Sequence, residues 1–269
     1  MRFIQIKKSM KILALLLIVT SLGSCGIKRP KESDKPIETT KYNKLSEDLV
    51  NNLKTNKSVT AIQSMLAKVD EAELNETLKL DEQRKAFWLN VYNGYIIDIL
   101  KKDKDQFKDR GTFFTKKQIT IAGNTLSFDD IENGMIRKSQ YKFGLGYVGK
   151  IFPPSFERRL CVKHRDYRIH FAINCGAKSC PPVRVYKAKT VNSQLQNAAK
   201  SYLTTHTKYD KNKNAVSTST LTSWFRGDFG GKSGTKEILK AFQLIPEDSN
   251  PSIDYGTYDW TLDIHNFAD

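Results

Sequence analysis

The first third of the chain carries apolar side chains at the three- and four-residue spacing of helices. Two such faces are formed by Leu45, Leu49, Val50 and Leu53 and by Ile62, Met65, Leu66 and Val69. A third helix is predicted from Asp81, and over residues 86–97 it is apolar on nearly every side. A helix that is apolar all round is normally buried, so we expect this one to form the centre of the fold.

The middle of the chain predicts a hairpin followed by a helix. Residues 117–128 alternate around an Ala-Gly-Asn turn, a pattern typical of two paired strands. Ser127, followed by Asp129 and Asp130, predicts the capped start of a helix that runs to about residue 138.

The rest of the chain predicts short elements of both kinds. In order these are an irregular loop over 141–154, a strand over 167–174, a helix over 190–205, an aromatic pair at 224–225, a Gly-rich turn, a short helix over 236–242 and an extended end. Helices followed by strands mixed with helices favour an α+β fold. We expect N-terminal helices and the buried central helix to pack on a small mixed or antiparallel sheet.

The N-terminus has the features of an export signal. A basic stretch over residues 1–11 precedes an apolar run over 12–19, which is too short to cross a bilayer as a helix. The run ends in Leu22-Gly23-Ser24-Cys25, which resembles the lipobox of bacterial lipoproteins. That resemblance implies a signal peptide over 1–24 and lipidation of Cys25 with fatty acyl chains such as palmitate. No later stretch is long and apolar enough to span a membrane.

Part of the positive net charge of the chain lies in the predicted signal peptide. The chain carries a formal net charge of +15, and the signal peptide would remove Arg2, Lys7, Lys8 and Lys11. An exported protein rarely meets nucleic acid, so we expect no nucleic-acid partner. The basic surface instead suits anionic headgroups or envelope polymers. We predict a flexible tether over 25–43 and one globular domain over 44–269, held in the bacterial cell envelope at the outer membrane or the periplasmic face.

The densest group of reactive side chains lies at residues 168–182. His170 on the predicted strand precedes Cys175 and a glycine-bearing turn. Backbone N–H groups at such a turn and a nearby histidine both stabilise a thiolate, and a thiolate with a histidine base is a usual arrangement for acyl transfer. Residues 170 and 175 would face opposite sides of one regular strand, so the pairing requires the turn to begin before Cys175.

Three alternatives compete with a catalytic thiol. Cys175 and Cys180 are close enough in sequence to form a disulfide, which an oxidising compartment permits. A zinc site is the second alternative, and its ligands would be Cys161, His164, Cys175 and Cys180. His170 is, in the third, a hydrogen-bonded histidine of the core. We expect neither a metal nor a cofactor.

Three blocks of the sequence together resemble one known family. They cover residues 86–94, 126–134 and 168–182, and the pairs Trp224-Phe225 and Asp228-Phe229 and the run Tyr258-Asp259-Trp260 match its closing blocks. The family is the domain-of-unknown-function 547 family, and the resemblance covers about residues 60–265. The family implies no settled activity. Two positions depart from its pattern, namely Tyr167, where proline is usual, and Asn133, where histidine is common.

The family in turn is similar to the papain and transglutaminase group of cysteine-dependent folds. Those folds place a nucleophile at the start of a buried helix, where this chain has Asn90 and Asn93. The similarity implies either that the nucleophile has moved to Cys175 or that the site is not catalytic.

Two functions follow from these residues. The first is a lipid-anchored, cysteine-dependent hydrolase or acyltransferase acting on a peptide-like substrate. Its nucleophile would be Cys175 and its general base His170, with Glu132 or Asn93 orienting the base. Residues expected to contact the substrate are Asn90, Lys178 and Trp88. The alternative is a non-catalytic envelope module that binds a peptide, glycan or protein, with Cys175 and Cys180 joined in a disulfide.

Overall fold

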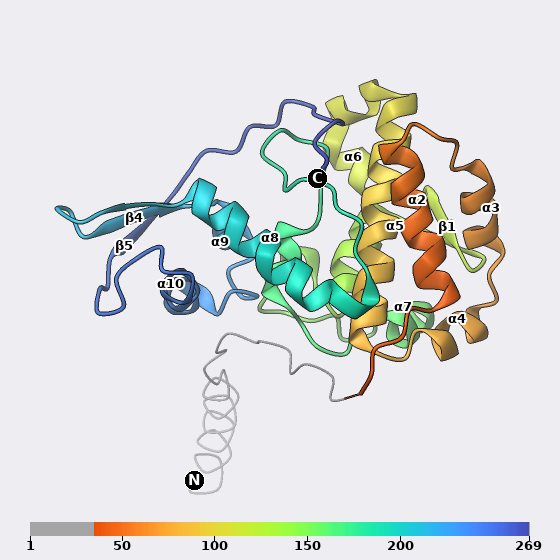
Figure 1. Ribbon diagram of the computed structural model, residues 1–269, viewed down its shortest axis with the longest axis horizontal. Coiled ribbons are helices and arrows are strands. Elements are labelled where there is room, and N and C mark those ends of the chain that lie inside the picture. The colour runs from red at the N-terminus through yellow and green to blue at the C-terminus, as the bar shows by residue number, and fades with distance from the viewer. Residues whose placement is uncertain (1–34, 269) are drawn as a thin grey trace, which may run out of the picture.

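The computed structural model describes residues 35–268 (Figure 1). The predicted signal peptide and the predicted lipid anchor Cys25 therefore lie outside the described residues. The folded part begins slightly earlier than the predicted boundary at residue 44. Helix α2 begins at Lys41, and both Tyr42 and Asn43 are buried. The end of the predicted tether is corrected accordingly.

The helices predicted for the first third are confirmed. They are α2 (Lys41–Lys54), α3 (Thr60–Lys68) and α5 (Asp81–Lys102), and a short helix α4 (Glu71–Thr77) that the pattern missed lies between the last two. Helix α5 is buried along almost its whole length and packs mainly against α2. It is the central helix that its apolar circumference predicted.

The predicted hairpin is also confirmed, and the helix after it differs in type. Strands β1 (Ile119–Ile121) and β2 (Asn124–Leu126) pair antiparallel across a turn in which Ala122 and Gly123 have positive φ. The 3-10 helix η1 (Lys104–Asp109) and helix α6 (Arg110–Thr115) precede this hairpin. The helix that follows the hairpin is η2 (Asp130–Ile136), which is a π-helix. The predicted cap is present, because the Ser127 hydroxyl accepts from the Asp130 amide while the Asp130 carboxylate accepts from the Ser127 amide.

The strand predicted over residues 167–174 is wrong. The chain forms a 3-10 helix, η4 (Tyr167–Phe171), whose first turn is capped by the Asp166 carboxylate accepting from the Arg168 amide. Arg168 forms an ion pair with the same carboxylate. The polar position in the alternating pattern is therefore Arg168, which faces the buried carboxylate of Asp166 and not solvent, as it would on a strand. The neighbouring short helices are η3 (Lys142–Gly144), α7 (Ser155–Leu160) and η5 (Ala188–Thr190).

The second half of the chain builds a separate small sheet. Strand β3 (Lys208–Asp210) pairs antiparallel with β4 (Ala215–Thr218), which pairs parallel with β5 (Ser252–Tyr255). The pattern missed β3 and β4, which are too short to show a period. Helix α9 (Leu221–Trp224) contains the aromatic pair's tryptophan, and α10 (Gly231–Ala241) begins earlier than predicted.

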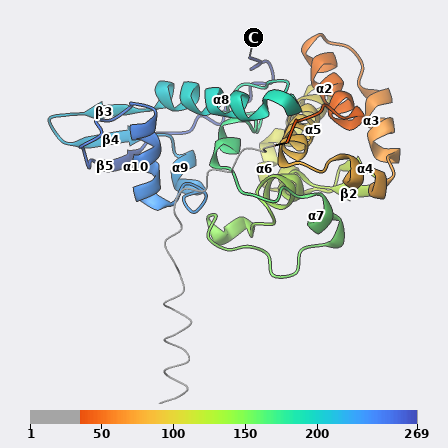
Figure 2. The same ribbon diagram turned by 60° about the horizontal axis from the view of Figure 1, so that its bottom comes forward.

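Helix α8 (Val191–His206) joins two hydrophobic cores. Its first half packs Val191 and Leu195 into a core around α5, and its second half packs Ala199 and Leu203 into a core with β4, β5 and α10. Figure 2 shows α8 running from the helical end of the molecule to the end that carries the sheet. The α+β class is thus confirmed, although α5 is covered mainly by helices and the three-stranded sheet packs beside α8.

The C-terminal segment crosses back from the sheet to the helical end of the molecule (Figure 1). It makes isolated bridges at Ala177–Leu262 and Val183–Phe267. The chain therefore closes over the region between the two cores, where the cavity described next is found. No helix within residues 35–268 is long and apolar enough to cross a membrane.

Candidate functional site

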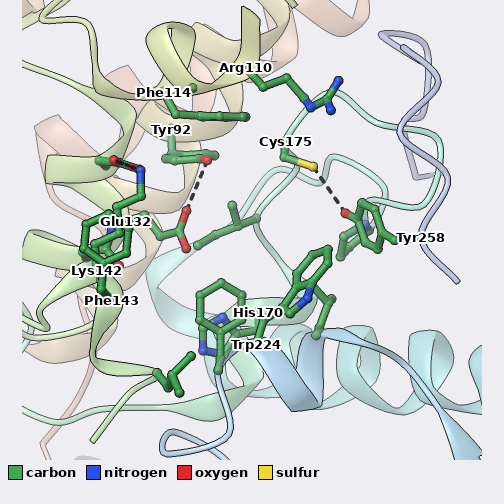
Figure 3. A pocket seen from close by; sticks show the side chains of 18 of the residues that line it. Tyr92, Arg110, Phe114, Glu132, Lys142, Phe143, His170, Cys175, Trp224 and Tyr258 are labelled. Carbon is green, nitrogen blue, oxygen red and sulfur yellow. Dashed lines mark hydrogen bonds and ion pairs between the residues drawn. The ribbon is translucent and has the colours of Figure 1, made fainter. Parts of the chain in front are cut away.

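A cavity of about 450 Å³ lies between the two cores. Its walls come from α5, α6, η2, the loop around η3, η4 and the segment that follows it, α9 and the C-terminal segment. Figure 3 shows Glu132, Cys175 and Tyr258 around the same space, with His170 and Trp224 below them. The cavity has the size of a small-molecule site.

Aromatic rings form much of the cavity wall. Trp224, Tyr258 and Trp260 contact one another with ring centroids 4.7–5.8 Å apart. The other aromatic side chains that line it are Tyr92, Phe114, Phe143 and Phe225. Such walls favour an apolar or ring-containing ligand.

His170 is held by a carboxylate that the sequence did not single out. Its Nε2 lies 2.8 Å from Oδ2 of Asp228, and its ring stacks on Phe225 with centroids 4.0 Å apart. Burial alone would raise the pKa of Asp228, but the hydrogen bond and charge of His170 and the positive charge of Arg137 outweigh it and bring the pKa to about 2. Burial lowers the pKa of His170 below its ordinary value.

The hydrogen bond with Asp228 assigns the tautomer of the histidine. The ionised carboxylate of Asp228 accepts a hydrogen bond, so the proton of the neutral imidazole sits on Nε2 and the lone pair on Nδ1. No residue within 35–268 forms a hydrogen bond with Nδ1, and His170 lines the cavity. Nδ1 is therefore the atom that can accept a proton or a hydrogen bond from a bound molecule.

Arg137 completes this buried cluster. Its Nε donates to Oδ2 of Asp228 at 2.8 Å, its Nη1 donates to Oδ1 of Asn133, and its guanidinium lies 4.6 Å from the ring centroid of Phe225. Asn133 is the position at which the resembled family commonly has histidine. In this chain it acts as a support for Arg137.

Glu132 faces the cavity from the π-helix and does not orient His170. Its Oε2 is 3.5 Å from the hydroxyl of Tyr92, and Asp228 occupies the position beside the histidine that was predicted for Glu132. Burial and, to a smaller extent, the charge of Asp129 raise the pKa of Glu132 to about 7, against the opposing effect of Arg137. Near neutral pH this side chain can therefore either donate or accept a proton.

Cys175 and Cys180 form a disulfide, with the hydroxyl of Tyr258 within 3.3 Å of the first sulfur and 3.1 Å of the second. Cys175 lines the cavity, but in the bonded form it has no thiolate. The nucleophile predicted at Cys175 is therefore not present in this structure. The disulfide also argues against the zinc site, because the bonded sulfurs of Cys175 and Cys180 are two of its four expected ligands. The described residues contain no cluster of three side chains that could hold a metal ion.

The two asparagines of α5 are structural. The amide of Asn93 donates to the Ala172 carbonyl at 2.8 Å and accepts from the Asn174 amide at 2.9 Å. Asn90 makes the same pair of bonds with the backbone of Tyr186. Both side chains are buried and bond to backbone groups, and the Asn90 amide also donates to the Ser46 hydroxyl. Neither asparagine lines the cavity, so the structure does not place them where the predicted orienting and substrate-binding roles would need them.

The remaining predicted contacts also lie away from the cavity. Trp88 is buried and its indole N–H donates to the Leu160 carbonyl at 3.0 Å. Lys178 is exposed, 3.9 Å from Asp259, and lines a different and smaller depression. Neither residue can touch a molecule in the cavity around His170.

Two cations, Arg110 and Lys142, line the cavity. The guanidinium of Arg110 lies 4.8 Å from the ring centroid of Trp260, and no carboxylate within residues 35–268 forms an ion pair with it. The other cation of the wall, Lys142, is paired with Asp129. Sequence reasoning missed Arg110, Arg137 and Asp228, although Asp228 stands in a block that matched the family.

Comparison with known protein families finds one match. Residues 75–203 form a DUF547 domain, described as a protein of unknown function. Comparisons with curated proteins and with solved structures found no match. The matched range contains Glu132, His170 and Cys175, whereas Asp228, Trp224 and Tyr258 lie beyond it. Similarity to the papain and transglutaminase group stays a prediction.

Proposed function

We propose that this protein is a non-catalytic binding module of the cell envelope, whose ligand is a small amphipathic molecule with an apolar body and one anionic group. The observation that carries the proposal is Arg110, which forms no ion pair with a carboxylate of residues 35–268 and lies at the wall of a cavity rich in aromatic side chains. A carboxylate, sulfonate or phosphate on the ligand would supply that partner.

The cavity supports binding rather than thiol chemistry. The Cys175–Cys180 disulfide occupies the only sulfur that the cavity wall presents among the described residues. The rings of Trp224, Tyr258 and Trp260 offer a surface against which an apolar body can stack. Glu132, when protonated, and Nδ1 of His170 can hydrogen-bond to polar atoms of the ligand.

A pair of fluorescent dyes tests the proposal. Anilinonaphthalene sulfonate and uncharged phenylnaphthylamine share one ring system and differ in the sulfonate. We expect the chain to bind the sulfonate more tightly, and Arg110→Gln to weaken that binding about tenfold, because a charge-assisted hydrogen bond is lost. The variant should bind the uncharged dye as the parent does.

The matched control is Arg184→Gln, since Arg184 does not line this cavity. It should leave both affinities unchanged. Equal affinity of the parent for the two dyes, or an equal loss of both in Arg110→Gln, would refute the proposed anionic ligand.

An acid–base enzyme is the second candidate. It is favoured by the presence, in one cavity, of a carboxyl group with a pKa of about 7 and a neutral imidazole held by a carboxylate. Hydrolysis of a panel of chromogenic esters, amides and glycosides, abolished by Glu132→Gln and by His170→Asn, would favour this enzyme over the binding module. A two-hydrogen mass deficit across Cys175 and Cys180 in the purified chain, with no labelling of Cys175 by iodoacetamide, would exclude a thiol mechanism.

The envelope location is part of the proposal. Release of the parent protein from membranes should require detergent. The Cys25→Ser variant should be removed from membranes by washing alone. Attachment of the variant that still requires detergent would contradict lipidation at Cys25.

A further inference from the structure

One segment concentrates the exposed apolar surface of the molecule. Seven of the ten large hydrophobic side chains exposed in the described part of the chain lie within residues 141–152, which we call the apolar loop. The most exposed are Phe143, Ile151 and Phe152, at 74%, 84% and 91% of their surface. Scattered single exposures are normal on a soluble surface, but a cluster of this kind marks an interaction site.

The backbone of the apolar loop is ordered. The Tyr141 amide donates to the Val148 carbonyl at 2.8 Å, and the Lys150 amide donates to the Ser139 carbonyl at 2.7 Å. The loop is also fastened to the body, because the Gly227 amide donates to the Leu145 carbonyl at 2.8 Å. The apolar side chains are therefore held outward by a defined structure.

The surroundings of the apolar loop are strongly basic. Residues 137–165 contain one acid, Glu157, against eight basic residues, namely Arg137, Lys138, Lys142, Lys150, Arg158, Arg159, Lys163 and Arg165. Five of the eight form ion pairs, namely Arg137, Lys142, Lys150, Arg159 and Arg165. Lys138 and Arg158 flank the loop and have no carboxylate partner within residues 35–268.

We propose that the apolar loop inserts into the surface of a lipid bilayer that contains anionic lipids. Phenylalanine, tyrosine and aliphatic side chains beside lysine and arginine are the composition of interfacial anchors, in which rings enter the headgroup region and cations meet lipid phosphates. The charge of the flanking residues is what favours a bilayer over an uncharged apolar partner. Figure 2 shows the segment that precedes α7 projecting from the body of the molecule.

The insertion would bring the cavity to the lipid surface. Phe143 and Leu145 belong both to the apolar loop and to the cavity wall. A ligand of the class proposed above, with an apolar body and an anionic group, could then enter from the bilayer. The membrane contact itself does not depend on that ligand.

Vesicle binding of the full chain tests the inference. Cys25→Ser is included in every variant, so that no acyl chain contributes. On vesicles of phosphatidylcholine with phosphatidylglycerol, Ile151→Ser combined with Phe152→Ser should weaken co-sedimentation at least tenfold. Lys138→Gln combined with Arg158→Gln should remove most of the preference for phosphatidylglycerol. Met65→Ser is the matched control, because Met65 is 56% exposed on α3, and it should bind as the parent does.

A reporter at the loop separates this contact from any contribution of the N-terminal residues. Phe152→Trp should add fluorescence that lipids brominated in their acyl chains quench. Quenching, with the expected loss in the serine variant, supports insertion. Vesicle binding without quenching, or equal binding of the serine variant, would overturn it. Self-association that the serine variant abolishes, with no quenching, would assign the apolar loop to contact between copies of the chain instead.

Discussion

Glu132 should make the stability of the protein fall as the pH rises. Its pKa is raised from 4.5 to about 7, because burial disfavours the charged carboxylate. A group whose pKa is raised on folding stabilises the folded state fully below its unfolded pKa, and that contribution is lost as the pH rises through the folded value. The loss attributable to Glu132 therefore lies between about pH 4.5 and pH 7.

The size of the effect follows from the shift. At about 1.4 kcal/mol for each pKa unit, the change in the free energy of unfolding amounts to about 3 kcal/mol. Glu132→Gln cannot ionise and should lose this pH dependence. Relative to the parent, the variant should become more stable as the pH rises from 4 to 8, by about 3 kcal/mol in total.

Urea unfolding at several pH values measures this difference. His170 titrates with the opposite sign, since its pKa is lowered on folding, but it contributes equally to parent and variant. Glu76→Gln, an exposed glutamate on α4, serves as the control and should keep the pH dependence of the parent. A constant difference between Glu132→Gln and the parent over this range would refute the raised pKa.

Three further changes test the packing around the cavity. Asn93→Ala should lower the free energy of unfolding by about 2–4 kcal/mol in urea titration, because two buried backbone groups lose their partners. Gly227→Ala should cost about 1–3 kcal/mol in the same assay, since a Cβ would lie 2.4 Å from the backbone of Gly146. Asp228→Asn should cost about 3–5 kcal/mol, because it leaves Arg137 buried without its anion, and NMR titration should show a further fall in the pKa of His170.

Each of these changes has a matched comparison. Asn93→Ala is compared with an alanine at exposed Asn212, which should cost little. Gly227→Ala is compared with Gly256→Ala, whose nearest contact would be 3.7 Å away, and equal costs would contradict the close approach. An unchanged or raised pKa of His170 in Asp228→Asn would show that the carboxylate does not act on the imidazole as the geometry requires.

Local patterns predicted the elements whose signal is local. The apolar residues that predict α5 are part of α5 itself, and the turn residues Ala122 and Gly123 directly join the two strands that they predict. The strand predicted over residues 167–174 was wrong. Its alternating polar position is Arg168, which forms an ion pair with Asp166 within a 3-10 helix, and alternation alone does not distinguish this arrangement from a strand.

The candidate site was predicted only in part, for a related reason. Glu132, His170 and Cys175, which were predicted as catalytic residues because reactive side chains stand out in the sequence, all line the cavity. The partner of His170 is 58 positions away, and no local pattern connects it to Asp228. The five-residue spacing of Cys175 and Cys180 is compatible with free thiols and with a disulfide, and the structure shows the disulfide.

The order of the wall residues along the chain also has a consequence for folding. The cavity is closed by Tyr92 at one extreme and Trp260 at the other, so its assembly requires contacts between residues that are very far apart in sequence. Contacts of this kind form late, after the local helices. A ligand would accordingly recognise only the fully assembled chain, and its binding would raise the cost of unfolding every element that meets at the cavity. A bound ligand should therefore increase the resistance to proteolysis along the whole of residues 92–260. This protection should extend past residue 203, where the DUF547 match ends.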